Sequence, residues 1–324
     1  IIILKPLKLA HHTFNSNLIQ GPLAGYSCAA MRVQTWRFSA PAYCSTEMVS
    51  ATHLVHAKKM PQRYLERDPN EGPLCFQLSA EDPAILAKAV QKISIIQPDI
   101  IELNCGCPVN KIRRKGAGSK LLTNPDQLKR LIQALRENTP SAISVKIRVA
   151  NDERDQDDTL IGKIAEQEGA DALVVHGRHW TEGYDKPCRL AQIKHLVDTV
   201  KIPVIGNGDV RDFQTLKTLF EATGCAGVMI ARASMGQPWL FAQLEAEYQQ
   251  RPFTKPSASI VGEVLINHIE RLARLDSEFH AVLQARKIGK YYARHTIDSA
   301  HDFTLSLTGC KTLKNFVELV QKFF

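Results

Sequence analysis

The sequence predicts a (β/α)₈ barrel followed by a helical domain. Eight short apolar runs alternate with amphipathic stretches, and they occupy about 240 residues, the usual size of such a barrel. After Trp239 the runs stop, and the remaining chain has a helical pattern rich in Arg, Lys and His. We therefore expect a catalytic barrel domain at residues 1–241 and a helical domain at residues 242–324.

The expected strands are runs of β-branched and other apolar residues without polar alternation, as in strands buried on both faces. They are residues 18–19, 42–44, 74–78, 100–103, 143–147, 173–175, 204–205 and 228–230. A doubly wound sheet would show fewer strands and an early Gly-rich dinucleotide motif. No G-x-G-x-x-G follows the first run, so the barrel is favoured.

The expected crossover helices are amphipathic, and the clearest are residues 83–93, 125–135 and 158–168. Pro83 follows Asp82, and Pro125 follows Asn124. Asp and Asn favour the position before a helix, and proline favours its first turn. These pairs therefore predict two helix starts.

The composition is that of an ordinary globular protein, with 44% apolar and 23% charged residues in 324. It excludes disordered, collagen-like and disulfide-scaffold classes. No apolar run approaches the roughly 20 residues of a membrane-spanning helix, so we expect no membrane partner. The apolar start at residues 1–4 is too short for a signal peptide, and because it lacks Met we expect a missing or processed N-terminus.

The net charge and the cysteine content indicate which partners the protein could bind and in which compartment it works. The net charge of +8 attracts polyanions, although such a surplus also serves solubility. The eight Cys show no C-x-x-C spacing, so we expect no metal site and no redox pair. A reducing, cytoplasmic location follows. We also expect no obligate protein partner.

Polar residues stand at the ends of the expected strands. In this fold the active site lies at the carboxyl ends of the strands, so these residues should converge on one face. Any one of them alone is more simply a hydrogen-bonded structural residue, but their convergence predicts a site. They include Gln77, Asn104, Lys146, Arg148, His176, Asn207 and Arg232.

The residue types at these ends favour a phosphorylated flavin over a sugar phosphate. Gly-rich turns after the last two strands allow backbone N–H groups to approach a phosphate, and Arg232 adds a bidentate charge partner. Gln77 and Asn207 carry amides suited to a flat heterocycle. Lys146 could place its charge beside a ring that becomes anionic.

Seven motifs stand at or near the strand ends: P-L-A-G at 22–25, S-T-E-M at 45–48, L-N-C-G-C-P at 103–108, K-G-A-G-S at 115–119, V-K-I-R at 145–148, V-H-G-R at 175–178 and I-G-N-G-D at 205–209. In order and spacing they resemble the tRNA-dihydrouridine synthases, most closely the bacterial B-type enzymes. The resemblance covers roughly residues 18 to 300. N-C-G-C-P followed by R-R-K-G-A-G-S is its most specific part.

The resemblance implies residue roles. Cys107 is the catalytic thiol, and Asn104 contacts both flavin and substrate base. FMN is lined by Pro22, Leu23, Ala24, Gln77, Lys146, His176, Asn207, Gly208, Asp209, Ala231 and Arg232. The substrate is bound by Asn104, Arg148, Arg178, Arg286 and Lys287. Two positions depart from the family pattern, since Ala231 replaces a usual Gly and Ile288-Gly289 stand where His is common.

The implied activity is reduction of the C5–C6 double bond of uridines in tRNA, with NADPH as reductant. Hydride passes from the flavin to C6, and Cys107 protonates C5. Cysteine thiols are mostly protonated at neutral pH, so a cysteine can serve as a general acid. The alternative interpretation of Cys107 is a buried residue beside a tight turn. We expect Cys105 to be structural.

A uridine inside folded RNA must be extracted before it can lie on a flavin, so the enzyme must also hold the surrounding backbone. The tail offers a basic helix with interleaved aromatic residues. It carries Arg286, Lys287, Lys290 and Arg294, with Tyr291, Tyr292 and His295 among them. We expect this helix to bind tRNA; the alternative is a solvated helix face.

Three other functions remain open at this point. A dihydroorotate or dihydropyrimidine dehydrogenase-like flavoprotein would use a similar FMN barrel on a free pyrimidine, but needs no basic tail. An RNA-binding protein on a decayed barrel would not keep Cys107, Lys146, His176 and Arg232. A Schiff-base aldolase would use Lys146 but not the set around Cys107. A yellow purified protein would separate the flavin enzymes from the other two.

Overall fold

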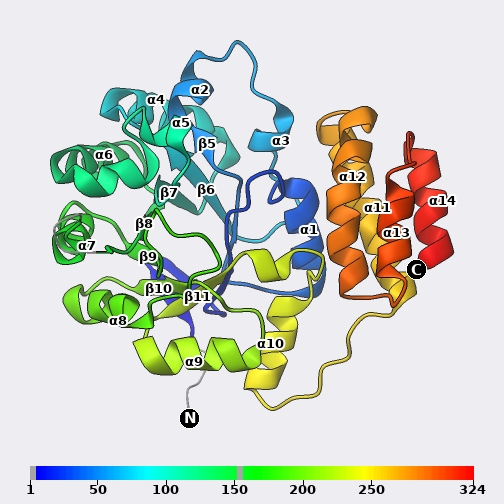
Figure 1. The fold of residues 1–324 in the computed structure, drawn as a ribbon. Helices are drawn as coiled ribbons and strands as arrows, with labels where there is room; N and C mark the ends of the chain where they lie inside the picture. Colours follow the sequence, from blue (N-terminus) through cyan, green and yellow to red (C-terminus); the bar gives the residue numbers. More distant parts are fainter. Residues whose placement is uncertain (1–4, 152–155) are drawn as a thin grey trace. The chain divides into compact units, whose positions relative to one another are not determined.

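The computed structural model describes residues 5–151 and 156–324, so the apolar start at residues 1–4 lies outside the described residues (Figure 1). The chain forms two compact units. The barrel unit comprises Ile1–Pro22, Pro41–Lys58 and Pro73–Ile230. The helical unit comprises Leu23–Ala40, Lys59–Gly72 and Ala231–Phe324.

The predicted barrel is confirmed. Within the described residues, eight parallel strands hydrogen-bond in the order β4-β3-β11-β10-β9-β8-β7-β6, and pairing of β4 with β6 closes the ring. Each contains or overlaps one of the expected apolar runs. The strands are β3 (Leu18–Gln20), β4 (Cys44–Ser45), β6 (Leu74–Ser79), β7 (Ile100–Cys105), β8 (Ala142–Arg148), β9 (Ala172–His176), β10 (Val204–Asn207) and β11 (Gly227–Ile230).

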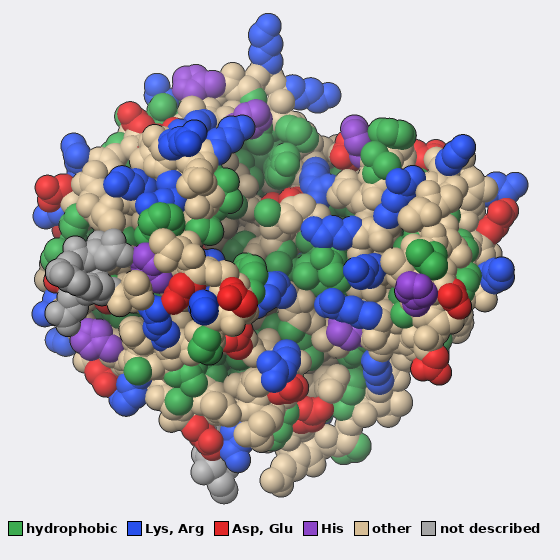
Figure 2. All heavy atoms as spheres, viewed as in Figure 1, with side chains coloured by type: hydrophobic (Ala, Val, Ile, Leu, Met, Phe, Trp, Pro, Cys, Tyr) green, Lys and Arg blue, Asp and Glu red, His purple; other side chains and the backbone are tan. Residues whose placement is uncertain are grey.

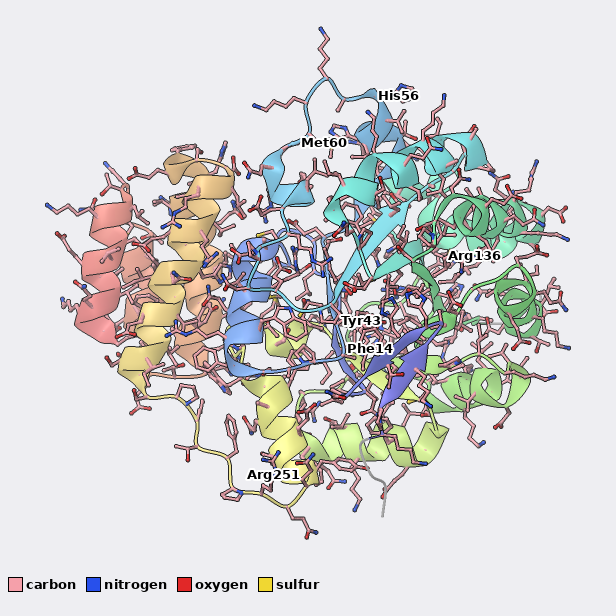
Figure 3. The ribbon with its side chains drawn as sticks, turned by 180° about the vertical axis from the view of Figure 1, so that it is seen from behind. Phe14, Tyr43, His56, Met60, Arg136 and Arg251 are labelled. Carbon is pink, nitrogen blue, oxygen red and sulfur yellow. The ribbon has the colours of Figure 1, made fainter. Side chains whose placement is uncertain are left out.

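Three further short strands were not predicted from the sequence. β5 (Val49–Ser50) pairs with β6, and β1 (Leu7–Leu9) forms an antiparallel hairpin with β2 (His12–Phe14). The hairpin side chains belong to a buried cluster that includes the amino-terminal ends of several barrel strands. Phe14 and Tyr43, 5.8 Å apart between ring centroids, mark this end in Figure 3. The hairpin therefore plugs one end of the barrel, and the carboxyl ends of the strands lie at the other.

Helices surround the barrel strands (Figure 1). Asp82 and Asn124 cap two of them, accepting hydrogen bonds from the backbone N–H groups of Ile85 (2.9 Å) and Gln127 (3.3 Å), with proline in the first turn. Both predicted helix starts are confirmed. The helices of this unit are α2 (Ala51–His56), α4 (Pro83–Ile93), α5 (Asn110–Arg113), α6 (Pro125–Asn138), α7 (Asp158–Gln167), α8 (Leu190–Thr199) and α9 (Phe213–Thr223), with 3₁₀ turns η1 (Ser94–Ile96) and η2 (Gly118–Thr123).

The helical unit is built around its own apolar core, which includes Leu265, Ile269, Phe303 and Phe316. A Cβ on Gly289 would lie 2.8 Å from a methyl carbon of Leu307, so this glycine allows two helices to pack closely. The elements are α1 (Ala29–Phe38), α3 (Gln62–Leu65), η3 (Arg232–Ser234), α10 (Leu240–Tyr248), α11 (Ala258–Leu275), α12 (Glu278–Arg294), α13 (Ala300–Leu307) and α14 (Leu313–Phe323).

The compact units are discontinuous in sequence, whereas we expected a single division after residue 241. Buried Arg32 explains one part of the difference. It forms an ion pair with Glu71 (2.6 Å) and donates to the carbonyl of Glu66, which joins α1 to the segment Lys59–Gly72. The assignment of FMN binding to residues 1–241 and tRNA binding to residues 242–324 stays a prediction. Across residues 5–151 and 156–324, no helix combines the length and apolarity that a membrane crossing requires.

Candidate active site

The barrel brings the polar strand-end residues together. In the parallel register, Asn104 lies beside Lys146, and His176 lies beside both Arg148 and Asn207. Pro22, Gly208 and Asp209 follow directly after strands of the same unit. Leu23, Ala24, Ala231 and Arg232, also predicted to line FMN, belong to the helical unit.

Glu102 is a functional candidate that the sequence reasoning missed. Its carboxylate is fully buried on β7 and accepts hydrogen bonds from Gln77 Nε2 (2.8 Å) and Ser144 Oγ (3.0 Å). Burial raises the pKa of Glu102, while the nearby charge of Lys146 and the two hydrogen bonds oppose that rise. The sequence contains a signal that could have identified it, because an acidic residue inside the otherwise apolar run 100–103 must be hydrogen-bonded or paired with a cation when it is buried.

Lys146 is a cation held at the carboxyl end of the barrel. Burial lowers the pKa of its ammonium to about 8, and the charge of Glu102 acts in the opposite direction. At neutral pH the side chain is therefore mostly protonated. Together with the amides of Gln77 and Asn104, it forms a donor set that could hold a flat heterocycle and favour negative charge on it.

The backbone of Cys107 is held from both sides. Its N–H donates to Asn104 Oδ1 (2.9 Å), and its carbonyl accepts from the backbone N–H and the hydroxyl of Ser119 (both 3.0 Å). Gly118 has φ +62°, and a Cβ there would lie 2.7 Å from the Cys107 carbonyl oxygen. The K-G-A-G-S segment thus fixes the loop that carries this thiol.

The two cysteines of the N-C-G-C-P motif differ in their surroundings. Cys105 is fully buried, and burial raises the pKa of its thiol. Cys107 is only partly buried. A reagent or substrate can reach only an exposed sulfur, so the geometry favours Cys107 as the reacting thiol and agrees with a structural role for Cys105.

Arg178 is almost fully buried in the turn after β9. Its guanidinium donates to Asp209 Oδ1 (2.5 Å), to the carbonyl of Lys186 (2.7 Å) and to His176 Nε2 (3.2 Å). A guanidinium can only donate, so His176 Nε2 accepts and the proton of the neutral imidazole sits on Nδ1. Arg178 therefore fixes the tautomer of His176.

Arg148 also contacts protein groups. It is buried and donates to the carbonyl of His179 (3.0 Å), which holds the loop after β9. Arg148 and Arg178 were both predicted to bind substrate, and that role stays a prediction. In the structure their hydrogen bonds position the loops around His176.

The turn after β10 depends on unusual backbone geometry. Gly208 has φ +139° and Asp209 has φ +57°. A Cβ on Gly208 would lie 2.7 Å from the sulfur of Cys188, and Asn207 Nδ2 donates to the carbonyl of Met229 (2.9 Å). A residue other than glycine would therefore be strained at position 208, and its Cβ would collide with Cys188.

In the helical unit, Arg232 is exposed at the start of η3. Helix α12 carries four exposed cations, Arg286, Lys287, Lys290 and Arg294. Figure 2 shows Lys and Arg side chains over the part of the molecule formed by α11 to α14. The basic surface expected on this helix is thus present.

The aromatic interleaving expected on α12 needs a correction. Tyr292 is 1% exposed and hydrogen-bonds His268 (3.0 Å) inside the core of the unit, so it cannot meet RNA. Tyr291 is partly buried, and Arg294 lies over its ring at 4.9 Å from the centroid. Among the Phe and Tyr side chains of this helix, the exposed one is Phe279, at its first turn. The helical period turns Tyr292 inward with Ala281, Ala285 and Ile288.

Comparison with known proteins agrees with the motifs. A family model for dihydrouridine synthase (Dus) matches residues 19–324. The chain is 32% identical over 293 residues to probable tRNA-dihydrouridine synthase 1 of Synechocystis, covering 90% of this chain and 81% of the relative. It is 29% identical over 321 residues to tRNA-dihydrouridine synthase B of Pseudomonas aeruginosa, covering 98% and 96%.

Solved structures show the same fold at low sequence identity. Histamine dehydrogenase from Rhizobium sp. 4-9 matches with a TM-score of 0.57 and 12% identity over 83% of this chain. The 6-hydroxypseudooxynicotine amine oxidase of Pseudomonas geniculata N1 matches with a TM-score of 0.59 and 11% identity over 77%. This chain spans 51% and 50% of their lengths, and at these identities the likeness shows the fold alone. The family-model match over nearly the whole chain places this protein in the dihydrouridine synthase family.

Proposed function

We propose that the chain is a flavin-dependent tRNA-dihydrouridine synthase that binds FMN and uses NADPH to reduce uridines in tRNA. The observation that carries the proposal is the Cys107 loop, which is tethered at the strand ends of the barrel, where Cys107 is only partly buried and Lys146 lies on the neighbouring strand. The curated relatives named as tRNA-dihydrouridine synthases support the substrate. A tRNA substrate also favours a cytoplasmic location.

The donor set fits FMN. Gln77 and Asn207 supply amides, and Lys146 supplies a cation where the reduced ring would carry negative charge. Arg232, exposed on η3, suits the phosphate. The further proposed FMN residues are Pro22, Leu23, Ala24, His176, Gly208, Asp209 and Ala231. When bound, the flavin would supply the hydride that adds to C6 of the uracil ring.

Cys107 holds the other hydrogen of the reaction. The proton on its Sγ passes to C5 as the C5–C6 double bond is lost, so the product gains one hydride and one proton. Asn104 and Ser119 fix the backbone on both sides of the thiol and so limit where the sulfur can stand. Such positioning accounts for much of the power of general-acid catalysis.

The tRNA contacts would come from outside the reacting centre. We propose that Arg286 and Lys287, with Lys290 and Arg294 on the same exposed surface, bind phosphates of the tRNA. Asn104, Arg148 and Arg178 would act near the extracted base. For Arg148 and Arg178 this action is through the loops that they hold.

The proposal is tested by mixing the purified full-length protein with NADPH and unmodified tRNA transcripts. Mass spectrometry of the digested tRNA should show dihydrouridine, and the protein should carry a flavin absorbance spectrum. Free uridine and free orotate serve as comparison substrates. A colourless protein, or a yellow protein that reduces free pyrimidines and leaves tRNA unchanged, would rule out the proposed activity.

A further inference from the structure

A chain of side-chain hydrogen bonds runs from the buried carboxylate of Glu102 to the Cys107 loop. Gln77 Nε2 donates to Glu102 Oε1 (2.8 Å), and Asn104 Nδ2 donates to Gln77 Oε1 (3.2 Å). Asn104 Oδ1 in turn accepts from the backbone N–H groups of Gly106 (3.2 Å) and Cys107 (2.9 Å). All five residues belong to the barrel unit.

The direction of this chain is fixed at both ends. The Glu102 oxygen that faces Gln77 accepts a hydrogen bond, so Gln77 must present its NH₂ group to it. At the other end, backbone N–H groups can only donate, so Asn104 must present its carbonyl oxygen. Only one orientation of the two amides satisfies both ends, and it joins Asn104 NH₂ to the Gln77 oxygen.

The location of Glu102 excludes two ordinary explanations for an acidic residue. The side chain is fully buried in the middle of a barrel strand, so it is neither a solvated surface group nor a helix cap. Ser144, opposite Glu102 in the β7–β8 register, donates to its second oxygen (3.0 Å). Burying a carboxyl group is costly, and the buried group here accepts a hydrogen bond that orients Gln77.

We infer that Glu102 is a positioning residue, which acts through Gln77 and Asn104 to hold the Cys107 loop in its reactive place. Loss of the Glu102 acceptor frees the Gln77 amide to rotate, which removes the constraint on Asn104 and then on the two backbone N–H groups. The consequence for the loop stands on the hydrogen bonds alone. The consequence for turnover rests on the proposed function.

The test compares three full-length variants with the parent. Glu102→Leu removes the acceptor with an apolar side chain of similar length. Glu102→Gln keeps an acceptor oxygen for Gln77 and lacks the charge. Ser144→Ala is the matched control, because it deletes the other hydrogen bond to Glu102 and leaves the chain to Cys107 intact.

The readout is the rate at which iodoacetamide labels each cysteine in the folded protein, followed by peptide mass spectrometry. Cys188 is the internal reference, since it is partly buried like Cys107 and lies outside the chain of hydrogen bonds. Labelling of Cys107 relative to Cys188 should rise about five- to tenfold in Glu102→Leu, the effect of losing roughly one net hydrogen bond. It should stay within about twofold of the parent in Glu102→Gln and Ser144→Ala.

Three outcomes would overturn the inference. They are parental labelling in Glu102→Leu, equal acceleration in Glu102→Gln, and equal acceleration in Ser144→Ala. If Glu102→Leu does not fold, Gln77→Met interrupts the same chain one step closer to Cys107 and should give the same acceleration. Labelling requires neither flavin nor tRNA, so it tests the loop even if the proposed activity fails. If the activity is present, Glu102→Leu should lower kcat for tRNA with little change in KM, and Glu102→Gln should restore it.

Discussion

Arg178 and Asp209 form an ion pair of 2.5 Å between the segments that follow β9 and β10, with the arginine side chain 1% exposed. Asp209 also accepts a hydrogen bond from the backbone N–H of Cys188 (2.9 Å), which ties a third segment to the same carboxylate. The pair thus fixes the backbone around His176 and around the glycine turn proposed to hold FMN. Removing the ion pair should therefore lower both the stability of the fold and the affinity for the cofactor.

Asp209→Ala should lower the free energy of unfolding by about 2–4 kcal/mol, because it leaves the buried guanidinium of Arg178 without its charge partner. The partial exposure of Asp209 places the loss toward the lower end of that range. Asp185→Ala is the control, since its ion pair with Lys186 is exposed and should be worth less than about 1 kcal/mol. Urea unfolding measures both, and equal losses would contradict the role of the Arg178–Asp209 pair.

Cys107→Ala should remain folded, yellow and reducible by NADPH, while its rate of dihydrouridine formation falls by about 10²–10⁴-fold, the usual contribution of a general acid. Cys105→Ala, two residues earlier and fully buried, should lose some stability and keep most of its activity. Mass spectrometry of tRNA nucleosides after single turnover measures the difference. Near-parental turnover by Cys107→Ala would remove the proposed proton donor.

Arg232→Ala should weaken FMN binding about ten- to a hundredfold, as expected for the loss of a charge-assisted contact of roughly 1.5–3 kcal/mol. Arg251→Ala, at an exposed position just after α10 of the same unit, should leave FMN affinity unchanged. Fluorescence titration of the flavin-free variants gives the two affinities. If both variants keep the parental affinity, the phosphate must be bound elsewhere.

Neutralising Arg286, Lys287, Lys290 and Arg294 together should weaken tRNA binding and flatten its dependence on salt, because each lost phosphate contact lowers the slope by something under one unit. NADPH oxidation without RNA should not change. The control removes four exposed cations elsewhere on the helical unit, at Arg274, Lys311, Lys314 and Lys322, for the same change in net charge. Equal loss of affinity in the two variants would mean that only total charge matters.

The flavin-free protein should become more stable as pH rises from about 8 to 10.5, relative to Lys146→Met. Burial lowers the pKa of Lys146 in the folded state to about 8 from an ordinary value of 10.5. Between these pH values the unfolded chain binds more protons at this group, so raising the pH favours the folded state. Below about pH 8 Lys146 is protonated in both the folded and the unfolded state, so the difference in stability between the two proteins no longer changes with pH at this group. Urea unfolding of both proteins across this range tests it, and parallel pH profiles would contradict it.

The sequence by itself determined the barrel, and it predicts Cys107 as the reactive thiol. Continuous apolar runs such as 173–175 and 228–230 mark strands buried on both faces, and the Asp82-Pro83 and Asn124-Pro125 pairs mark helix starts by local chemistry alone. These signals depend only on neighbours along the chain. Very short elements such as Val49–Ser50 carry too few residues for any periodic pattern.

Only the tertiary structure decided what the polar residues contact. Gln77, Glu102 and Ser144 are distant in sequence and meet because the parallel register sets β6, β7 and β8 side by side. Burial of Arg178 against Asp209, the inward position of Tyr292 and the place of α1 in the helical unit also depend on which surface packs against which. A sequence pattern gives the period of a strand or helix; the partner on each face comes from long-range packing, and that packing turns a polar residue into a contact or a positioning group.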